Sequence, residues 1–389
     1  MNVGISALGH LSEDTGGKNY IVHFFRELAR EHHDHHFTLF LSSGERPKLG
    51  IEPTDWLSII EIPGSSRTPL HKVAAEQFRL PRYIQRAKID IMYYPGNFVS
   101  LFSHVPAIVN IRAVAHCYGA KYGIRGVRRF IRSLLMPRSA RKAKAIITPS
   151  EDIKLDVIRF MHIAEKKIHV IPHGVDTSLF NGGKNRDNND SRIALNKFGL
   201  YPNKYILYVS ALWRYKNQDK LIRAHAELVT QGFSDLKLVI VGRGTGTEEK
   251  YLNEIYSLPK RLGTDSLVIF TGSVPQSELR YLYANARAFV FPSAYESFGN
   301  PIFEAWASGI PIAASNVHSF PEIIGEGDRA AGLLFDPTNI SEITESIARL
   351  LEDKELSSKL IQRGRGNVKR FTWEACVGRT LFLIERVMG

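Results

Sequence analysis

Residues 286–316 read ARAFVFPSAYESFGNPIFEAWASGIPIAASN, and this stretch predicts a strand, a loop, a helix and a second strand in succession. Asn300 is a favourable N-cap residue and Pro301 suits the first helical position, so the helix is expected to begin there, directly after Gly299. The free backbone N–H groups of that helix start would point toward the end of the strand. Because Gly299 has no side chain, a phosphate group could approach these amides closely, and the helix dipole favours its charge.

Two carboxylates flank this turn, since Glu296 lies in the loop and Glu304 lies on the first turn of the expected helix. Carboxylates repel phosphates, so the pair is expected to accept hydrogen bonds from hydroxyl groups on either side of an amide-bound diphosphate. Each residue alone also has a simpler interpretation, because Glu304 can complement a helix N-terminus and Glu296 can be a solvated loop residue. Their combination with the intervening SFGNP favours a binding site.

Short apolar runs alternate with longer amphipathic segments along most of the chain, and this alternation predicts parallel sheets covered by helices. The same alternation begins again after a polar stretch at residues 181–192, and this stretch is expected to be a surface connection near a domain boundary. We therefore expect two doubly wound, Rossmann-like α/β domains facing across a cleft, residues 1–172 and 173–371. The C-terminal helix of residues 372–389 is expected to pack back on the first domain.

Length and composition agree with this organisation, because 389 residues exceed what one hydrophobic core usually supports. The net charge of +12 favours an anionic partner such as a nucleic acid, an acidic membrane surface or a phosphorylated substrate. The two cysteines, Cys117 and Cys376, exclude a disulfide framework. The chain shows neither a signal peptide nor a membrane-spanning run, so a cytoplasmic location is expected.

The spacing of Glu296 and Glu304, with SFGNP between them and EAWASGIPI after them, resembles the nucleotide-sugar site of retaining GT-B glycosyltransferases, specifically glycosyltransferase family 4. Further stretches look like landmarks of that family and occur in the family's order: AIITPSE, VIPHGVDTSLF, YILYVSALWRYKN, LVIVGRG and VIFTGSVPQSELRYLYANA. The resemblance implies a GT-B fold whose second domain binds most of a nucleotide diphosphate sugar. The donor-binding residues that it implies are Gly16, Gly17, Gly242, Gly272, Val274, Glu296, Ser297, Phe298, Gly299, Asn300, Pro301 and Glu304.

The loop SALWRYKNQDKLIRA carries Lys216 immediately before a helix that Asn217 is expected to cap. The ammonium and the free amides would converge there on one anion. In the similar family such a lysine, usually with an arginine five residues earlier, neutralises the departing nucleotide diphosphate. Here the earlier position is Ala211 and the nearest arginine is Arg214, so the catalytic group is expected to comprise Lys216, Glu296 and Arg214. The alternative is that these cations are solvated loop residues.

Two loops of the first half are also candidates for the site. Gly16 and Gly17 follow the opening strand, where family members place a glycine pair near the donor phosphates, although two glycines can equally form a flexible turn. After PAIVNI, many relatives carry a histidine that contacts the donor sugar, and this chain offers Arg112 and His116 as acceptor or sugar contacts. A lone histidine is more often structural.

Residues 121–144 contain nine lysine and arginine residues, no acidic residue and several interleaved apolar side chains. Such a surface suits anionic lipid headgroups and would place the protein peripherally on the inner face of the plasma membrane. The alternative is an ordinary solvated helix face.

The resemblance implies transfer of a hexose, with a mannosyl-like sugar favoured, from a GDP- or UDP-linked donor to a glycan or lipid-linked acceptor, with retention of anomeric configuration. The setting would be the synthesis of a cell-surface polysaccharide or glycolipid. No DxD motif follows a strand, so no metal and no cofactor are expected, and Lys216 and helix N-termini would supply the positive charge. The alternatives are a GT-B nucleotide-sugar 2-epimerase, a phosphorylase and a basic nucleic-acid-binding protein.

Overall fold

The structure, a computed structural model, describes residues 1–8, 16–30, 34–48, 50–64, 68–119, 121–122, 126–186, 188–244 and 248–389. Its contacts divide the chain into two compact units. Unit 1 comprises Met1–Ala120, Ile124–Gly174 and Trp373–Gly389, and unit 2 comprises Lys121–Gly123 and Val175–Thr372.

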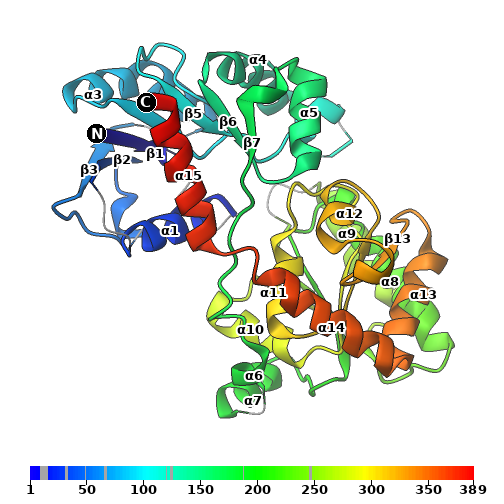
Figure 1. The fold of residues 1–389 in the computed structure, drawn as a ribbon. Coiled ribbons are helices and arrows are strands. Elements are labelled where there is room, and N and C mark those ends of the chain that lie inside the picture. The colour runs from blue at the N-terminus through cyan, green and yellow to red at the C-terminus, as the bar shows by residue number, and fades with distance from the viewer. Residues whose placement is uncertain are drawn as a thin grey trace. The chain divides into compact units, whose positions relative to one another are not determined.

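Within the described residues, unit 1 is built on a parallel sheet with the strand order β3-β2-β1-β4-β5-β6-β7 (Figure 1). Its strands are β1 (Asn2–Ser6), β2 (His36–Ser42), β3 (Leu57–Ile62), β4 (Ile91–Tyr94), β5 (Ala107–Asn110), β6 (Ala145–Thr148) and β7 (Ile168–Val170). Its α-helices are α1 (Gly16–Leu28), α2 (Pro69–Ala74), α3 (Leu80–Arg86), α4 (Gly126–Lys142), α5 (Glu151–Met161) and α15 (Trp373–Met388). All residues of β4, β5 and β6 are buried, as expected for parallel strands covered on both faces.

The C-terminal helix α15 belongs to unit 1 and packs along α1. The ring of Trp373 stacks on His23 at 5.2 Å and meets Tyr20 edge-on at 5.4 Å, while Cys376 and Val377 lie in the core of the unit. Gly174 allows the close approach that brings the chain back, because a Cβ there would lie 2.3 Å from the backbone nitrogen of Trp373. The contacts thus place the boundaries at residues 174/175 and 372/373, beside the expected 172/173 and 371/372.

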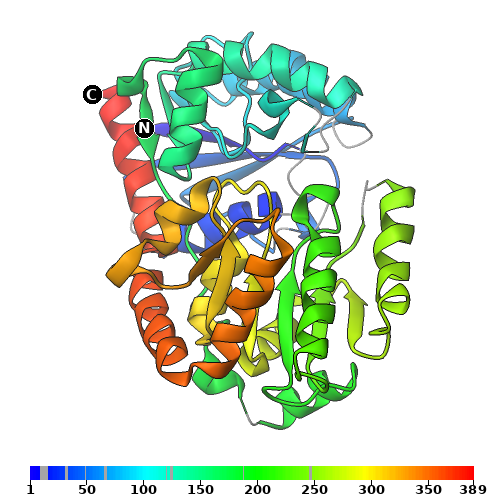
Figure 2. The ribbon, with the colours of Figure 1, turned by 90° about the vertical axis from the view of Figure 1, so that its right-hand side faces the viewer.

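Unit 2 has a second parallel sheet, whose strand order among the described residues is β10-β9-β8-β11-β12-β13. Its strands are β8 (Tyr205–Val209), β9 (Lys237–Val241), β10 (Val268–Gly272), β11 (Ala288–Phe291), β12 (Ile312–Ser315) and β13 (Leu333–Phe335). Its α-helices are α6 (Gly182–Asn185), α7 (Asn189–Asn196), α8 (Gln218–Thr230), α9 (Glu249–Arg261), α10 (Gln276–Asn285), α11 (Asn300–Ser308), α12 (Ser319–Ile324), α13 (Ile340–Glu352) and α14 (Lys354–Val368). Helices cover this sheet, as the second view shows (Figure 2), and the predicted doubly wound α/β architecture is confirmed in both units.

The polar stretch at residues 181–192 differs from the expectation of a surface connection. Asn181 and Asn188 accept hydrogen bonds from backbone N–H groups and cap α6 and α7, so the stretch forms helices of unit 2. Gly182 permits this packing, since a Cβ there would lie 1.9 Å from the carbonyl oxygen of Ser308. The asparagines that suggested a loop are in fact helix caps.

No helix among the described residues is both long enough and apolar enough to cross a membrane.

Candidate functional site

The loops that follow β8 and β11 bring Lys216 and Glu296 together. The two strands are hydrogen-bonded parallel neighbours, so their carboxyl ends meet at the edge of the sheet where open α/β folds bind ligands. Lys216 ends the short helix η5 (Arg214–Lys216), and its Nζ donates a hydrogen bond to Oε1 of Glu296 in an ion pair. Only 7% of the Lys216 side chain and 17% of the Glu296 side chain are exposed. Two of the three residues predicted to be catalytic, Lys216 and Glu296, therefore form one largely buried pair.

Aromatic rings surround this ion pair. Nζ of Lys216 lies 5.0 Å from the ring centroid of Tyr215 and 5.4 Å from that of Phe291, and the ring of Tyr295 lies 4.7 Å from that of His318. Rings exclude water from the pair and so strengthen its electrostatic attraction. Tyr215 and Tyr295 directly precede Lys216 and Glu296 in the sequence, so both tyrosines could have been predicted as residues of the site but were not.

His318 was also missed, and the sequence offers no signal for it. It lies in the loop between β12 and α12, and it has the positive φ of 53° that non-glycine residues rarely adopt. The next residue, Ser319, donates a hydrogen bond of 3.2 Å from its Oγ to the carbonyl oxygen of Glu296. The loop after β12 thus supports the loop that carries the predicted carboxylate.

The start of α11 has the geometry of an anion site, although its cap differs from the prediction. Gly299, not Asn300, occupies the N-cap position, with φ 80° and ψ 48°, and no side chain caps this helix start. Pro301 falls in the first two helical positions, as expected. A Cβ on Gly299 would lie 2.7 Å from the ring of Phe320. Glycine is therefore required both by the left-handed backbone and by the packing of Phe320.

Glu304 lies on the second turn of α11, not on the first turn as expected. Burial raises the pKa of its carboxyl group to about 7, and the nearby Tyr283 hydroxyl acts in the opposite direction. The carboxyl group therefore titrates close to neutral pH, and only its ionised form is purely a hydrogen-bond acceptor.

Arg214, the third residue predicted to be catalytic, contacts helix α9, and Asn217 contacts two loops. The guanidinium of Arg214 lies 4.6 Å from the ring centroid of Tyr251, and its Nη1 lies 3.6 Å from Oε2 of Glu254 on α9. Asn217 occupies the N-cap position of α8, but its side chain does not cap the helix as expected. Its Nδ2 instead donates hydrogen bonds to the carbonyl oxygens of Pro292 at 2.8 Å and Pro337 at 3.3 Å. Asn217 thereby ties together the loops after β11 and β13.

Of the remaining predicted donor residues of unit 2, Gly272 ends strand β10 and the others lie in the loops after β9, β10 and β11. The backbone N–H of Gly242 donates to the carbonyl oxygen of Gly272 at 2.9 Å, and a Cβ on Gly242 would lie 1.9 Å from the carbonyl oxygen of Ser210. Val274 packs against the core, and Phe298 is buried against Phe303 with ring centroids 4.6 Å apart. Ser297 is half-buried. The side chain of Phe298 is therefore a core side chain.

In unit 1, Gly16 is the first residue of α1 and Gly17 follows it, while the preceding loop lies outside the described residues. Arg112 follows β5, with its guanidinium 5.7 Å from the ring centroid of Tyr20. Burial lowers the pKa of Arg112. His116 is buried on the next turn of the same loop, and burial together with Arg132 and Arg129 lowers its pKa to about 4.

Most of the described part of the basic segment forms α4. Its exposed face carries apolar side chains in the first half, where Val127 is 61%, Phe130 is 68% and Leu134 is 39% exposed. Arg138 and Arg141 are exposed in the second half, while Met136 and Ala140 are buried. The solvent face of this helix is therefore partly apolar and partly cationic.

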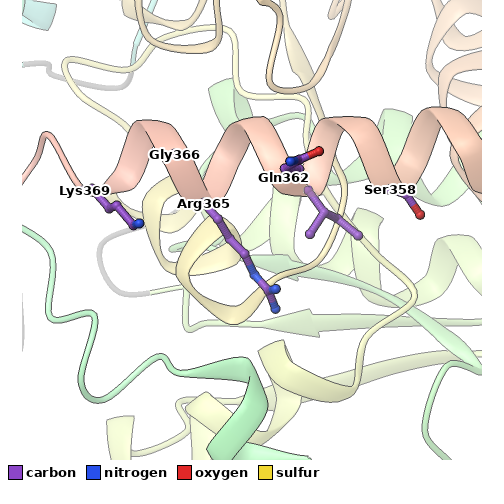
Figure 3. Close-up of a pocket in the computed structure, with 6 residues that line it drawn as sticks. Ser358, Gln362, Arg365, Gly366 and Lys369 are labelled. Carbon is purple, nitrogen blue, oxygen red and sulfur yellow. The ribbon is translucent and has the colours of Figure 1, made fainter.

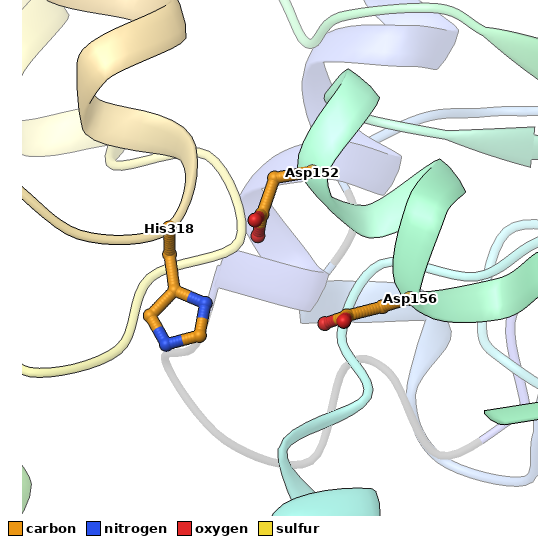
Figure 4. A group of neighbouring side chains, drawn as sticks. All are labelled: Asp152, Asp156 and His318. Carbon is orange, nitrogen blue, oxygen red and sulfur yellow. The ribbon is translucent and has the colours of Figure 1, made fainter. Parts of the chain in front are cut away.

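Two further features of the chain lie outside the predicted residues. Asp152 and Asp156 project from one face of α5 (Figure 4), and Asp156 accepts hydrogen bonds of 2.7 and 2.9 Å from the Tyr118 hydroxyl. A cavity of about 410 Å³ runs along α14 (Figure 3) and is lined by Ser358, Ile361, Gln362, Arg365, Gly366 and Lys369. None of these residues belongs to the loops of Lys216 and Glu296.

Comparisons with known proteins agree on one class. The family described as Glycosyltransferase Family 4 matches residues 15–179, and the family described as Glycosyl transferases group 1 matches residues 192–367. The O-antigen chain mannosyltransferase B of Escherichia coli is 31% identical over 61% of this chain and 60% of its own length. The MMP alpha-(1->4)-mannosyltransferase of Mycolicibacterium hassiacum is 29% identical over 66% of this chain and 57% of its own length.

These alignments thus span about 60% or less of the two curated relatives. Among solved structures, Anabaena HepE in complex with UDP-glucose superposes with a TM-score of 0.78 at 17% identity, covering 99% of this chain and 100% of that one. The likeness to HepE shows the GT-B fold, and the two family matches, which together span residues 15–179 and 192–367, show that the chain belongs to glycosyltransferase family 4.

Proposed function

We propose that the protein is a retaining hexosyltransferase that takes its sugar from a nucleotide diphosphate donor, with GDP- and UDP-mannose or glucose as the first candidates. Two of the relatives matched in sequence are described as mannosyltransferases and others as D-inositol 3-phosphate glycosyltransferases, and HepE is described in complex with UDP-glucose. The acceptor is a glycan or a lipid-linked sugar, as in the synthesis of surface polysaccharides and glycolipids.

The observation that carries this proposal is the position of Lys216 and Glu296 at the same sheet edge as the uncapped start of α11. Cleavage of the bond between the sugar and the diphosphate leaves an additional negative charge on the leaving phosphate oxygen. A positioned ammonium stabilises that charge more in the transition state than in the ground state. Donor binding would shift Lys216 from Glu296 toward the diphosphate, which frees the Glu296 carboxylate to accept hydrogen bonds from sugar hydroxyls.

Lys216 and the α11 amides supply the positive charge in this proposal, so the reaction does not require a metal. The direct test is turnover of GDP- and UDP-sugars in EDTA and in added Mg²⁺, with the anomeric configuration of the product read by NMR. Equal rates in both buffers and a retained configuration are expected. An inverted product, or activity that EDTA abolishes and Mg²⁺ restores, contradicts the proposal.

A thermal-shift screen with the nucleotide diphosphates tests donor binding without knowledge of the acceptor. A ligand that binds only the folded state at a hundred times its Kd stabilises that state by about 2.7 kcal/mol. One of GDP and UDP is expected to raise Tm by several degrees. No shift with either nucleotide would remove the proposed donor class.

The exposed face of α4 supports a peripheral position on an anionic membrane, because apolar side chains would enter the interface while Arg138 and Arg141 meet lipid phosphates. Each basic residue near the surface contributes about 1 kcal/mol. Cosedimentation with acidic liposomes is expected to recover the wild type in the pellet and to leave Phe130→Ser in the supernatant. Phe382→Ser on α15, where the phenylalanine is 65% exposed, is the matched control and should still pellet. Equal recovery in the supernatant with neutral and acidic lipid contradicts this surface.

A further inference from the structure

The positive charge of the chain is concentrated in residues 91–150, most of which belong to unit 1. Residues 91–150 contain ten lysine and arginine residues and no aspartate or glutamate, whereas the whole chain has a net charge of +12. Part of this charge, including Arg138 and Arg141, lies on the exposed face of α4. Arg112 and Arg132 are half-buried instead, and the distribution therefore separates an outer and an inner group of cations.

The inner group lies where an α/β sheet is expected to bind a ligand. The strand order of unit 1 reverses direction between β1 and β4, and crevices at such switch points form outside the carboxyl ends of the strands. Arg112 follows the carboxyl end of β5 and lies over Tyr20 of α1, the helix that follows β1. The Tyr20 hydroxyl lies 2.7 Å from the hydroxyl of Tyr93 at the end of β4. Arg112 is therefore placed beside the switch point.

Like charges gather around this position. Arg132 acts electrostatically on Arg112, and both Arg129 and Arg132 act on His116. Arg129 lies beside the loop that joins these residues, because a Cβ on Gly119 would lie at an ordinary van der Waals distance of 3.9 Å from its Nη2. Clustered cations repel one another, so an anion among them would lower the energy of the site.

Two buried polar atoms beside the cluster have no hydrogen-bond partner among the described residues. His116 is 1% exposed, its Nε2 contacts Sγ of Cys117 at 3.4 Å, and its Nδ1 has no hydrogen-bond partner in the described part of the chain. Asn110, the last residue of β5, is also 1% exposed, and its Oδ1 lacks a partner among the same residues. A buried polar atom without a partner costs about 1–3 kcal/mol, so both atoms indicate that a polar ligand completes the site.

We propose that Arg112, Arg129, Arg132 and His116 form an anion site that binds a phosphate group of the acceptor. The guanidinium groups would hold the phosphate oxygens in charge-assisted hydrogen bonds, Nδ1–H of His116 would donate a further one, and Oδ1 of Asn110 would accept from an acceptor hydroxyl. This inference rests on the proposed function and adds the acceptor class, which is a phosphorylated sugar or a phosphate-linked lipid.

The test is titration calorimetry of inorganic phosphate into the full chain saturated with its preferred nucleotide diphosphate, so that the donor site is already filled. Phosphate is expected to bind the wild type, and Arg112→Gln and Arg129→Gln are each expected to weaken it about tenfold or more. Arg138→Gln removes the same charge from the exposed face of α4 and should leave the affinity within about twofold. Arg129 is exposed, so its substitution reports on the site even if Arg112→Gln impairs folding.

Equal weakening by Arg129→Gln and Arg138→Gln would show diffuse attraction to the basic stretch and would overturn the proposal. So would absence of phosphate binding to a protein that binds its nucleotide. Failure of nucleotide binding itself would instead count against the proposed function, so the two failures are distinguishable.

Competition experiments then separate the two sources of phosphate. Glucose 1-phosphate in buffer and farnesyl phosphate in detergent micelles each present one phosphate, on a soluble sugar and on a lipid. Displacement of inorganic phosphate by either compound, lost in Arg129→Gln, supports the site and identifies the acceptor class. Displacement by neither compound overturns an organic phosphate as the ligand.

Discussion

The charged side chains of the two units are arranged differently: opposite charges are paired in unit 2, and like charges are neighbours in unit 1. In unit 2, Lys216 and Glu296 form a largely buried ion pair. In unit 1, Arg112 and His116 lie near further positive charges: Arg132 lowers the pKa of both, and Arg129 lowers that of His116. In the function proposed above, a donor diphosphate would compete with Glu296 for Lys216, and the like charges around Arg112 would attract an anion. This contrast is the reason why we propose a catalytic cation in unit 2 and an anion site in unit 1.

The largest expected effect is the loss of the unit 2 cation. Lys216→Ala is expected to reduce turnover about a hundredfold to a thousandfold, since removal of one group that stabilises transition-state charge costs about 3–4 kcal/mol. Arg214→Ala is the matched control, because Arg214 is an exposed cation two residues away that contacts Tyr251 and Glu254. Its turnover should change less than about tenfold. If steady-state kinetics showed a larger loss of turnover in Arg214→Ala than in Lys216→Ala, the catalytic role proposed for Lys216 would be contradicted.

Glu304 should make donor affinity pH-dependent. Its pKa of about 7 means that the acceptor form is lost as the pH falls, so affinity should decline about tenfold between pH 8 and pH 6. Glu304→Gln should bind more weakly at pH 8 and lack this component of the decline. Calorimetry measures the donor affinity of the wild type and of Glu304→Gln at pH 8 and pH 6. Ionisation of the nucleotide phosphate affects the two proteins equally, so a difference between their pH slopes reports on Glu304. Identical pH slopes would exclude Glu304 from the donor contacts.

The glycines of unit 2 separate backbone strain from packing. Gly299 and Gly272 both have positive φ, but only at Gly299 would a Cβ meet a neighbour, the Phe320 ring at 2.7 Å. Gly299→Ala is expected to destabilise the fold by about 2–3 kcal/mol and Gly272→Ala by about 1 kcal/mol. Denaturant unfolding measures both. Equal losses would mean that Phe320 moves aside without cost.

An effect of similar size on stability is expected in unit 1, from the low pKa of His116. The folded pKa of about 4 lies below the ordinary value of 6.5, so the group stabilises the fold above pH 6.5, and this contribution is lost as the pH falls toward 4. Between pH 7.5 and pH 5 the loss should be about 1–2 kcal/mol. His116→Gln should reduce this pH dependence, while His104→Gln, at an exposed position, should not. Parallel unfolding curves for wild type and His116→Gln would contradict a buried neutral ring.

The fold could be predicted from the sequence because it depends on local patterns, and the same patterns place Lys216 and Glu296 in loops that follow strands. Apolar runs specify buried parallel strands, and Gly299 followed by Asn300 and Pro301 specifies a helix start. The direct pairing of Lys216 with Glu296 was not predicted, since it depends on the adjacency of β8 and β11, which are far apart in the chain. His318 was missed for the same reason.

Other differences arise where one residue type serves two structural roles. Asparagine favours both loops and helix caps, so residues 181–192 suggested a connection but formed α6 and α7. Asn217 and Asn300 suggested caps, but Asn217 holds two loops together and Gly299 takes the N-cap position of α11. Tertiary packing decides between such roles, and a single sequence does not contain it.

The central claim is that Lys216 meets the terminal phosphate of the nucleotide diphosphate. Calorimetry with a nucleoside diphosphate and the matching monophosphate, against wild type and Lys216→Ala, measures the coupling between this side chain and that phosphate. The account predicts that the wild type prefers the diphosphate by at least tenfold and that Lys216→Ala loses most of this preference. An unchanged preference in Lys216→Ala would contradict it.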